Sequence, residues 1–418
     1  MMLALALILI GVRAAFASTA FILPGGEIPG WTKLPPTVCK LCVPTVVGQK
    51  PLTQADYATL LTNNMSLDDK LGQLMLVQFV GHTATPDAIR MINQQGAGGV
   101  LFFGLNIDTA SQVKALTAQL QGVASIPLLI AVDQEGGPVN RFQRIVGDLP
   151  SASSLTSPDE AHTRGVNDAR YLHDLGFNLN LAPIADVGVS NPELAGRTFG
   201  SDPARVATYA GAYLDGLQQE NHVTATLKHY PGLGATSTDP HFGLPVLNRS
   251  RADWERIDLE PYRELLDQHD VRAIMVSHEM IPAVDKNYPS SLSPATVTGV
   301  LRDELGYQGV VVTDSLYMGA LNAHWSVPQA AVLAVIAGAD LIIGPDGPQT
   351  VKLTKDAFHQ ALDSGKLTQQ RLDQSVQRVL LMKIKMGVIP MPASSQATET
   401  PASATSTPLI RPSATPTR

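Results

Sequence analysis

Residues 227–241 hold, within one short stretch, the residue types that chemistry on a polar ligand needs. Lys228 and His229 follow an apolar run, glycines and prolines then end any regular element, and Asp239 and His241 come last. A lysine donates hydrogen bonds to hydroxyl groups, and a histidine titrates near neutral pH. Asp239 is close enough along the chain to orient the ring of His241. The stretch therefore indicates proton transfer at a polar ligand, although a surface loop with two histidines is an alternative interpretation of the same residues.

Polar residues also follow other apolar runs of the chain. Asp133, Asp186, His278 and Asp314 each come at or shortly after the end of such a run, as Lys228 does. One polar residue at such a place is often a turn former. Five consecutive runs that end this way are much harder to explain as turns. Because the residues just past the strands of a parallel barrel meet at one rim, we expect these side chains to share a site.

The apolar runs predict the fold class. Eight of them are expected to be strands, and they lie at residues 74–80, 99–103, 127–132, 178–182, 223–227, 273–277, 309–313 and 339–343. Amphipathic segments, expected to be helices, separate them. This alternation favours an α/β fold with a mostly parallel sheet, and eight repeats in about 340 residues fit a single (β/α)8 TIM-like barrel. A doubly wound open sheet is the alternative, but no Gly-x-Gly-x-x-Gly follows an early strand.

The composition excludes several classes of protein. The chain has 418 residues, of which 44% are hydrophobic and 16% are charged. Such a chain can bury a large core, which argues against wholesale disorder. The net charge is −7 and no block of lysine and arginine occurs, so the sequence shows no electrostatic footprint for nucleic-acid binding.

The N-terminal end of the chain predicts export. Residues 1–10 are almost wholly apolar and Ala15-Phe16-Ala17 offers a small-residue cleavage site, so residues 1–17 are expected to be a signal peptide. No basic residue precedes the apolar run, which departs from the usual pattern, and an uncleaved membrane anchor is the alternative. We expect an extracellular or cell-surface protein, with no membrane insertion beyond this N-terminus.

Three further segments complete the expected organisation. They are a Pro-rich linker at residues 18–50, a barrel domain at 51–390 and a disordered Ser/Thr/Pro tail at 391–418. The only two cysteines, Cys39 and Cys42, lie in the linker. No second pair completes a zinc site and no βαβ pattern surrounds them, so we expect a small disulfide or two idle thiols. We expect neither a metal nor a cofactor.

Four stretches of the chain resemble a known family. Residues 228–241 resemble the signature of the bacterial β-N-acetylhexosaminidase branch of glycoside hydrolase family 3, a Lys-His-aromatic-Pro-Gly-x-Gly followed by Asp-x-His. Residues 132–141 resemble its sugar-binding Asp and Arg, residues 196–203 its second Arg segment, and residues 309–320 its nucleophile strand. The resemblance covers nearly all of residues 52–390. It implies a single TIM-like barrel, because the chain has no room for the second domain of larger members.

The resemblance implies a role for each matching residue. Asp314 would be the nucleophile that attacks the anomeric carbon, His241 the general acid/base, and Asp239 the carboxylate paired with it. The residues that hold the sugar hydroxyls and the N-acetyl group would be Asp133, Arg141, Arg197, Lys228 and His229. Retaining glycosidases usually use two carboxylates for these two tasks, so a histidine would here replace one of them.

Two residues depart from the family pattern. Pro240 stands where Ser or Thr is usual, and Ser315 stands where many relatives have a second Asp. A proline restricts the residue before it to extended conformations, so the loop is expected to be stiffer. Elsewhere we expect His278 to be a packed, hydrogen-bonded histidine, Asp186 to cap a loop, and Glu135 to support a glycine turn rather than touch substrate.

The leading interpretation is a retaining exo-β-N-acetylglucosaminidase that releases terminal GlcNAc from cell-wall fragments or chitin-type oligosaccharides through a covalent glycosyl-enzyme. We expect a monomer whose partner is this carbohydrate. A phosphorylase is one alternative, since a histidine acid/base carries no negative charge to repel phosphate. A β-glucosidase and a non-catalytic sugar-binding module are the others. The Asp-x-His loop, which the resemblance ties to N-acetylated substrates, argues against the β-glucosidase, and the intact Asp314, Asp239 and His241 argue against the binding module.

Overall fold

The computed structural model describes residues 52–188 and 190–392 of the chain. The expected signal peptide, the Pro-rich linker with Cys39 and Cys42, and all but the start of the C-terminal tail lie outside these residues, so those expectations stay predictions. Within the described residues, no helix has the length and apolar character that crossing a membrane requires.

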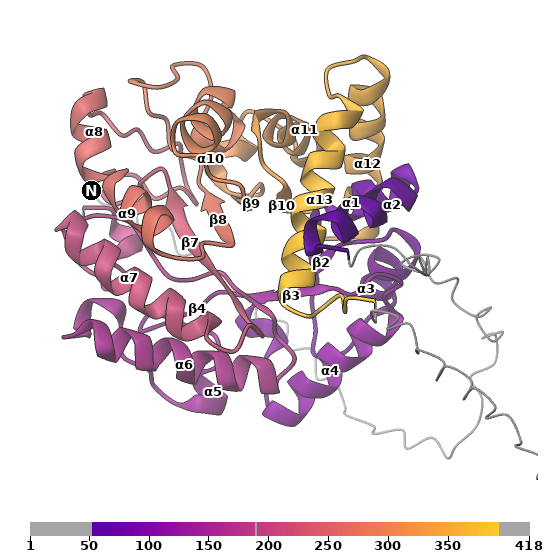
Figure 1. Ribbon diagram of the computed structural model, residues 1–418, viewed down its shortest axis with the longest axis horizontal. Coiled ribbons are helices and arrows are strands. Elements are labelled where there is room, and N and C mark those ends of the chain that lie inside the picture. The colour runs from indigo at the N-terminus through magenta and orange to yellow at the C-terminus, as the bar shows by residue number, and fades with distance from the viewer. Residues whose placement is uncertain (1–51, 189, 393–418) are drawn as a thin grey trace, which may run out of the picture. The chain divides into compact units, whose positions relative to one another are not determined.

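Eight parallel strands form a closed barrel (Figure 1). In chain order the strands are β1 (Met75–Gln78), β2 (Gly99–Phe102), β3 (Leu129–Val132), β6 (Leu179–Asn180), β7 (Thr224–Tyr230), β8 (Ala273–Val276), β9 (Val310–Ser315) and β10 (Leu341–Ile343). The first strand closes the barrel by pairing with the last, with Leu76 opposite Ile343. The predicted TIM-like barrel is therefore confirmed, and the open sheet is wrong.

Alternation along each strand divides the apolar side chains between two cores. In β3, Leu129 and Ala131 belong to the cluster inside the barrel, whereas Ile130 and Val132 belong to the larger cluster between the strands and the helices. Successive side chains of a strand point to opposite faces, so a continuous apolar run fills both cores at once. This is why the strands of the sequence read as short apolar blocks.

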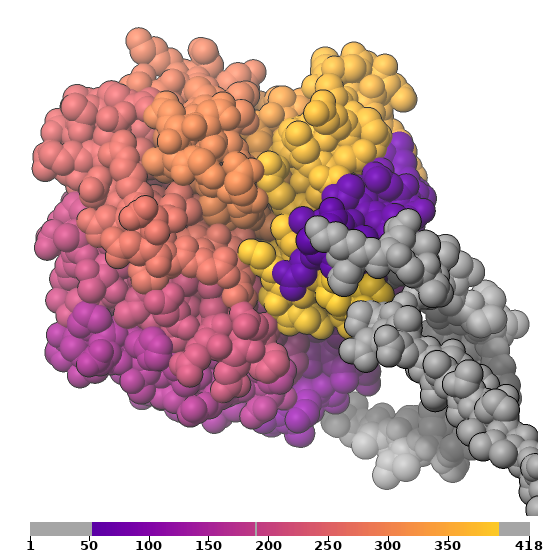
Figure 2. Space-filling model, in the orientation of Figure 1, coloured from indigo at the N-terminus to yellow at the C-terminus, as the bar shows by residue number. Residues whose placement is uncertain are grey.

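The helices surround the barrel, and most begin at a side-chain cap. The α-helices are α1 (Gln54–Asn64), α2 (Leu67–Gln73), α3 (Pro86–Ile89), α4 (Ala110–Val123), α5 (Gln143–Val146), α6 (Pro158–Asp174), α7 (Pro203–Gln218), α8 (Arg251–Ile257), α9 (Glu260–Gln268), α10 (Gly319–Asn322), α11 (Val327–Ala337), α12 (Pro348–Asp363) and α13 (Gln369–Lys385). The 3₁₀ turns are η2 (Gly104–Asn106), η3 (Ala152–Ser154), η4 (Pro192–Leu194) and η5 (Ser290–Leu292), and the π-helical segments are η1 (Arg90–Gln94) and η6 (Ala295–Glu304). The Ser157 hydroxyl, for example, accepts from the Glu160 amide at 3.2 Å, and Pro158 opens α6. Figure 2 shows α13 in yellow lying against α1 in indigo, so the last helix packs against the first.

Three details differ from the sequence expectation. Strand β7 continues through Tyr230, so Lys228 and His229 lie within the strand rather than after it. Strand β9 likewise includes Asp314. A two-stranded hairpin of β4 (Gln134–Gly136) and β5 (Val139–Asn140) follows β3 and was not expected.

Candidate active site

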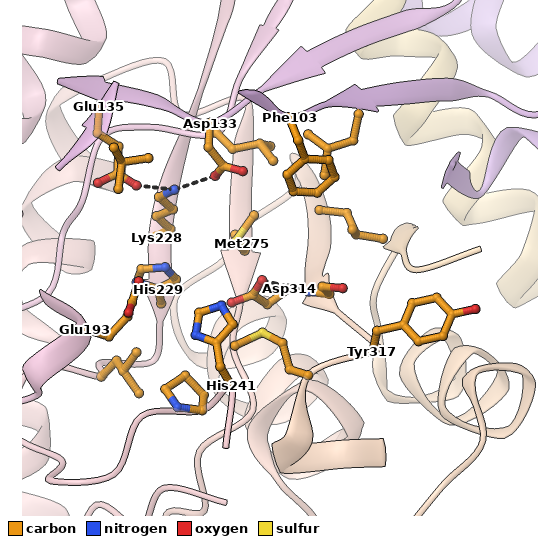
Figure 3. A pocket seen from close by; sticks show the side chains of 18 of the residues that line it. Phe103, Asp133, Glu135, Glu193, Lys228, His229, His241, Met275, Asp314 and Tyr317 are labelled. Carbon is orange, nitrogen blue, oxygen red and sulfur yellow. Dashed lines mark hydrogen bonds and ion pairs between the residues drawn. The ribbon is translucent and has the colours of Figure 1, made fainter. Parts of the chain in front are cut away.

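A cavity of about 310 Å³ lies at the carboxyl ends of the strands (Figure 3). Its floor contains Leu101, Leu181, Met275 and Ile343, which belong to the strands β2, β8 and β10 or directly follow β6. Seven of the eight predicted site residues line it, namely Asp133, Arg141, Arg197, Lys228, His229, His241 and Asp314. The eighth, Asp239, contacts one of the seven. The structure thus gathers every predicted site residue at one place.

A network of alternating charges forms one wall of the cavity. The Lys228 ammonium lies 2.7 Å from Asp133 and 2.6 Å from Glu135. Both oxygens of Glu135 accept from Arg197, each at 2.8 Å. Burial raises the pKa of Glu135, but Lys228 and Arg197 outweigh burial and lower this pKa to about 2. Glu135 therefore does more than support a turn: it lines the cavity and is the shared counterion of both cations.

Arg141 stands apart from this network. Arg141 lines the cavity, and its Nε is buried without a hydrogen-bond partner. Within residues 52–188 and 190–392, no carboxylate forms an ion pair with it. By contrast, Arg197 is fixed by Glu135 and by Glu193, the latter at 2.8 Å. Arg141 is thus the arginine of this wall whose donors are available to a ligand.

A buried carboxylate sets the orientation of His229. Asp186 is fully buried and accepts from the His229 ring Nδ1 at 2.7 Å and from the His229 amide at 3.1 Å. Its other oxygen accepts from the Leu233 amide at 2.6 Å. Asp186 does cap a loop, as expected, but it also turns the Nε2 edge of His229 away from itself. That second role depends on a contact between positions 43 residues apart, which the sequence does not reveal.

Asp314 lies at the end of β9 and faces the cavity. Its carboxylate accepts from the Ser315 amide at 2.7 Å. Burial raises the pKa of Asp314, but His229, His278 and the Ser315 amide hold this pKa below its usual value. His278 itself is packed, with Nδ1 at 2.8 Å from the Ser291 hydroxyl and Nε2 at 3.0 Å from the Ser315 carbonyl, as the sequence predicted. Asp314 is therefore a carboxylate at neutral pH, which is the form that a nucleophile requires.

His241 and Asp239 lie on the loop that follows β7. One oxygen of Asp239 accepts from the His241 amide at 2.9 Å and contacts the ring Nδ1 at 2.8 Å. The contact with Nδ1 leaves Nε2 of the ring to face the cavity. The His241 side chain is 52% exposed, and Figure 3 shows it facing the same cavity as Asp314. This arrangement gives an oriented proton carrier and a carboxylate within one cavity.

Glu193 is a site residue that the sequence interpretation missed. It lines the cavity, and its oxygen, with ligand atoms of Asp239 and His241, falls in a group whose members lie within 4.8 Å of one another. Carboxylate and imidazole atoms at this spacing could hold a divalent cation. The expectation that no metal is needed stays a prediction. The only sequence signal for Glu193 is its spacing, four residues before Arg197.

The fold and the site together indicate an enzyme. A parallel barrel with an ionised carboxylate and a histidine–carboxylate pair at its carboxyl rim has a nucleophile and a proton carrier where barrel enzymes keep their active sites. Residues 66–382 match the family described as the glycosyl hydrolase family 3 N terminal domain. The chain belongs to this family and is a glycoside hydrolase.

Individual relatives agree with this assignment. The chain is 32% identical over 319 residues to the Beta-hexosaminidase of Nitrosomonas eutropha, a match that covers 73% of this chain and 90% of the relative. It is 36% identical over 338 residues to the Beta-hexosaminidase LpqI of Mycobacterium tuberculosis, covering 76% and 83%. Among solved structures, a family 3 β-N-acetylglucosaminidase from a Paenibacillus species superposes with a TM-score of 0.75 at 35% identity, covering 80% of this chain and 65% of that one.

Proposed function

We propose that the protein is a retaining exo-β-N-acetylglucosaminidase that releases terminal GlcNAc from cell-wall fragments or chitin-type oligosaccharides. The observation that carries the proposal is the presence of Asp314 and the Asp239–His241 pair on one cavity. The names of the relatives, β-hexosaminidases and a β-N-acetylglucosaminidase, support the choice of sugar. A cavity of about 310 Å³ with a closed apolar floor suits one terminal sugar rather than an internal one.

The chemistry divides between the two sides of the cavity. In the first step the Asp314 carboxylate attacks the anomeric carbon while the Nε2–H of His241 protonates the departing oxygen, leaving the sugar bound to Asp314. In the second step His241 accepts a proton from water, and the water oxygen displaces Asp314. Asp239 keeps the Nδ1 side of the ring engaged throughout. The charge of Asp239 also stabilises the imidazolium when the ring is protonated.

The charged wall would hold the sugar. Lys228 and Arg197 are fixed by carboxylates, so their remaining donors and the oxygens of Asp133 can meet hydroxyl groups at set positions. Arg141, with no ion pair among the described residues, is the donor best placed to take the N-acetyl oxygen or another acceptor of the substrate.

Hydrolysis of nitrophenyl β-GlcNAc and nitrophenyl β-glucoside, with and without phosphate, tests the proposal. We expect rapid release from the GlcNAc substrate, slow release from the glucoside, and free GlcNAc as the product in either buffer. Proton NMR should show the β-anomer first. Sugar 1-phosphate as the main product would identify a phosphorylase, and an α-anomer would contradict a retaining mechanism. Chitotriose labelled at its reducing end should lose one GlcNAc at a time and give first a labelled disaccharide; release of an unlabelled disaccharide with a labelled monosaccharide would contradict this exo action.

We also propose that the protein is exported and monomeric. The apolar run at residues 1–10 and the Ala15-Phe16-Ala17 site support export, although both lie outside the described residues. Mass spectrometry of protein from the native host should find a chain that begins near Ser18. An intact Met1 in a cytosolic fraction would contradict export, and light scattering of the purified protein would reveal a dimer.

A further inference from the structure

The loop that carries the acid/base pair, residues 231–243, contains neither helix nor strand, yet its first half is held firmly. Asn191, fully buried, donates from its side chain to the Thr236 hydroxyl at 2.7 Å and to the Thr238 carbonyl at 3.0 Å. The Asn191 backbone amide also donates to the Gly234 carbonyl, at 3.3 Å. These hydrogen bonds from Asn191 end just before the Asp239–His241 pair, so other contacts must fix the position of His241.

A second set of hydrogen bonds to the loop comes from the segment that follows the nucleophile. Helix α10 begins at Gly319, five residues after Asp314. The Gly319 amide donates to the His241 carbonyl at 3.1 Å, and the Ala320 amide donates to the Pro240 carbonyl at 3.0 Å. These are the first amides of a helix, which have no acceptor within the helix itself. The two peptide groups on either side of the His241 Cα are therefore both held by α10.

The absence of a side chain at Gly319 permits this contact. A Cβ built at Gly319 would lie 2.5 Å from the His241 carbonyl oxygen and 3.1 Å from the Phe242 carbonyl carbon. Carbon–oxygen contacts normally begin near about 3.3 Å, so a methyl group there would displace the loop by roughly 1 Å. Gly319 does not adopt a left-handed backbone conformation. Alanine would therefore be acceptable to the backbone, and its only cost would be the lost approach of the loop.

We propose that Gly319 is a positioning residue for the reaction, because it lets the acid/base loop dock directly on the nucleophile segment and so sets the reach of His241 across the cavity. The inference rests on the proposed roles of Asp314 and His241. Gly319 touches neither substrate nor reacting atoms, and acts through the backbone of residues 240–242. The expected consequence of adding a methyl group is an acid that no longer reaches the leaving oxygen, while the nucleophile keeps its place in β9.

Gly319→Ala tests the proposal, with Gly122→Ala as the matched control. Gly122 lies in α4, and a Cβ built there meets nothing within 4 Å. Two substrates are compared: chitobiose, whose leaving sugar needs protonation, and nitrophenyl β-GlcNAc, whose leaving group needs little. For Gly319→Ala we expect kcat/KM on chitobiose to fall about 10²-fold and on the nitrophenyl substrate by less than about threefold. Gly122→Ala should match the wild type on both.

Several outcomes overturn the inference. Equal losses on the two substrates would make Gly319 a structural residue, and no loss on either would show that the contact does not position His241. Hydrogen exchange of the amides in residues 233–243 gives a readout that does not depend on turnover. It should quicken in Gly319→Ala and not in Gly122→Ala, and unchanged exchange would contradict docking.

A second variant keeps the proposal testable if Gly319→Ala does not fold. Ala320→Pro removes the N–H that serves the Pro240 carbonyl and puts a ring carbon in its place, at a position in the first helical turn where proline is tolerated. It should show the same unequal loss on the two substrates, and a loss equal on both would count against the proposal. Failure of the proposed function would appear differently, as a wild type that cleaves neither substrate.

Discussion

Two buried lysines at opposite ends of the barrel have contrasting surroundings. The Lys228 side chain, near the carboxyl end of β7, is 2% exposed and lies between two carboxylates on the wall of the cavity. Lys383, in α13, is fully buried, and among residues 52–188 and 190–392 its ammonium meets only neutral acceptors, at 2.7–2.8 Å. Those acceptors precede the first three strands, and they are the Gln73 side chain and the carbonyls of Gly98 and Pro127.

The difference appears in the charge state of each lysine. Burial lowers the pKa of Lys228, but Asp133 and Glu135 outweigh it, so this pKa is raised. Burial acts on Lys383 with no such opposition and lowers its pKa to about 7. A buried charge therefore does not by itself mark a functional site. Opposite charges grouped around a cavity do mark such a site, because carboxylates hold a cation in place while some of its hydrogen-bond donors stay free for a ligand.

Removing the nucleophile should have the largest effect on activity. Asp314→Ala is expected to lower kcat by ~10⁴-fold or more while the protein stays folded, since the carboxylate that forms the glycosyl-enzyme is gone. Steady-state kinetics with nitrophenyl β-GlcNAc, alongside thermal unfolding, measures this. A variant that keeps more than a small fraction of the wild-type rate would assign the nucleophile to another residue.

The buried carboxylate at the opposite end of the barrel provides the matched comparison. Asp340 is fully buried and pairs with Arg302 at 2.6 Å, Arg378 at 3.2 Å and Arg371 at 3.3 Å. Asp340→Ala should leave kcat/KM of the folded protein unchanged and lower the free energy of unfolding by about 3–5 kcal/mol, because it leaves one buried and two partly buried arginines without their counterion. A kinetic loss at full folding would show that the two ends of the barrel are coupled.

Removing His241 from the acid/base pair should lower activity by a factor that depends on the leaving group of the substrate. His241→Ala is expected to lower kcat/KM on chitobiose by roughly 10²–10⁴-fold, the usual worth of general acid/base assistance. The loss on nitrophenyl β-GlcNAc should be far smaller, because nitrophenolate departs with little protonation. Equal losses on the two substrates would assign His241 to binding or structure.

The sequence predicted the barrel and the core of the site for one physical reason. Strands buried on both faces read as short apolar runs, and the residue at the end of each run reaches a common rim. Asp133, Lys228 and Asp314 were found in this way. Strand limits were less certain: β6 keeps only Leu179–Asn180 in the ladder, whereas β7 extends three residues beyond the apolar run.

Residues whose role depends on long-range contacts could not be predicted. Glu135 meets Arg197 across 62 residues, and Asp186 meets His229 across 43. Asp186 was expected at the rim because it follows an apolar run, but no local signal indicates the partner of either carboxylate, because each lies in a loop-like stretch until the barrel closes. The β4–β5 hairpin was not predicted for a related reason, since strands of two or three residues are too short to show an alternation of apolar and polar residues.

Lys228→Met should lower activity less than either catalytic change. Methionine fills a similar volume but offers no donor to the sugar and leaves Asp133 and Glu135 without their shared cation. Loss of hydrogen bonds to a charged group is worth about 1.5–3 kcal/mol, so kcat/KM should fall about 10²-fold. Steady-state kinetics on chitobiose, where both catalytic changes are felt in full, measures this, and a variant with wild-type kcat/KM would remove Lys228 from the sugar site.

Lys383→Met should leave activity unchanged and alter only the pH dependence of stability. The pKa of Lys383 is about 7 in the folded protein and 10.5 for an unburied lysine. Between these values the unfolded chain holds a proton that the folded chain lacks, so the lysine makes stability rise with pH, by about 1.4 kcal/mol per unit. Below pH 7 both states are protonated and this contribution is flat.

Urea unfolding at several pH values between 7 and 9.5 isolates the effect of Lys383. The free energy of unfolding of the wild type minus that of Lys383→Met should increase with pH across this window. Lys352→Met is the control, because the side chain of Lys352 is 61% exposed and the corresponding difference should stay constant. A constant difference for Lys383→Met would mean that the three neutral acceptors keep the ammonium charged in the folded protein. The contrast between the two ends of the barrel would then rest on the cavity alone and not on the charge state of the two lysines.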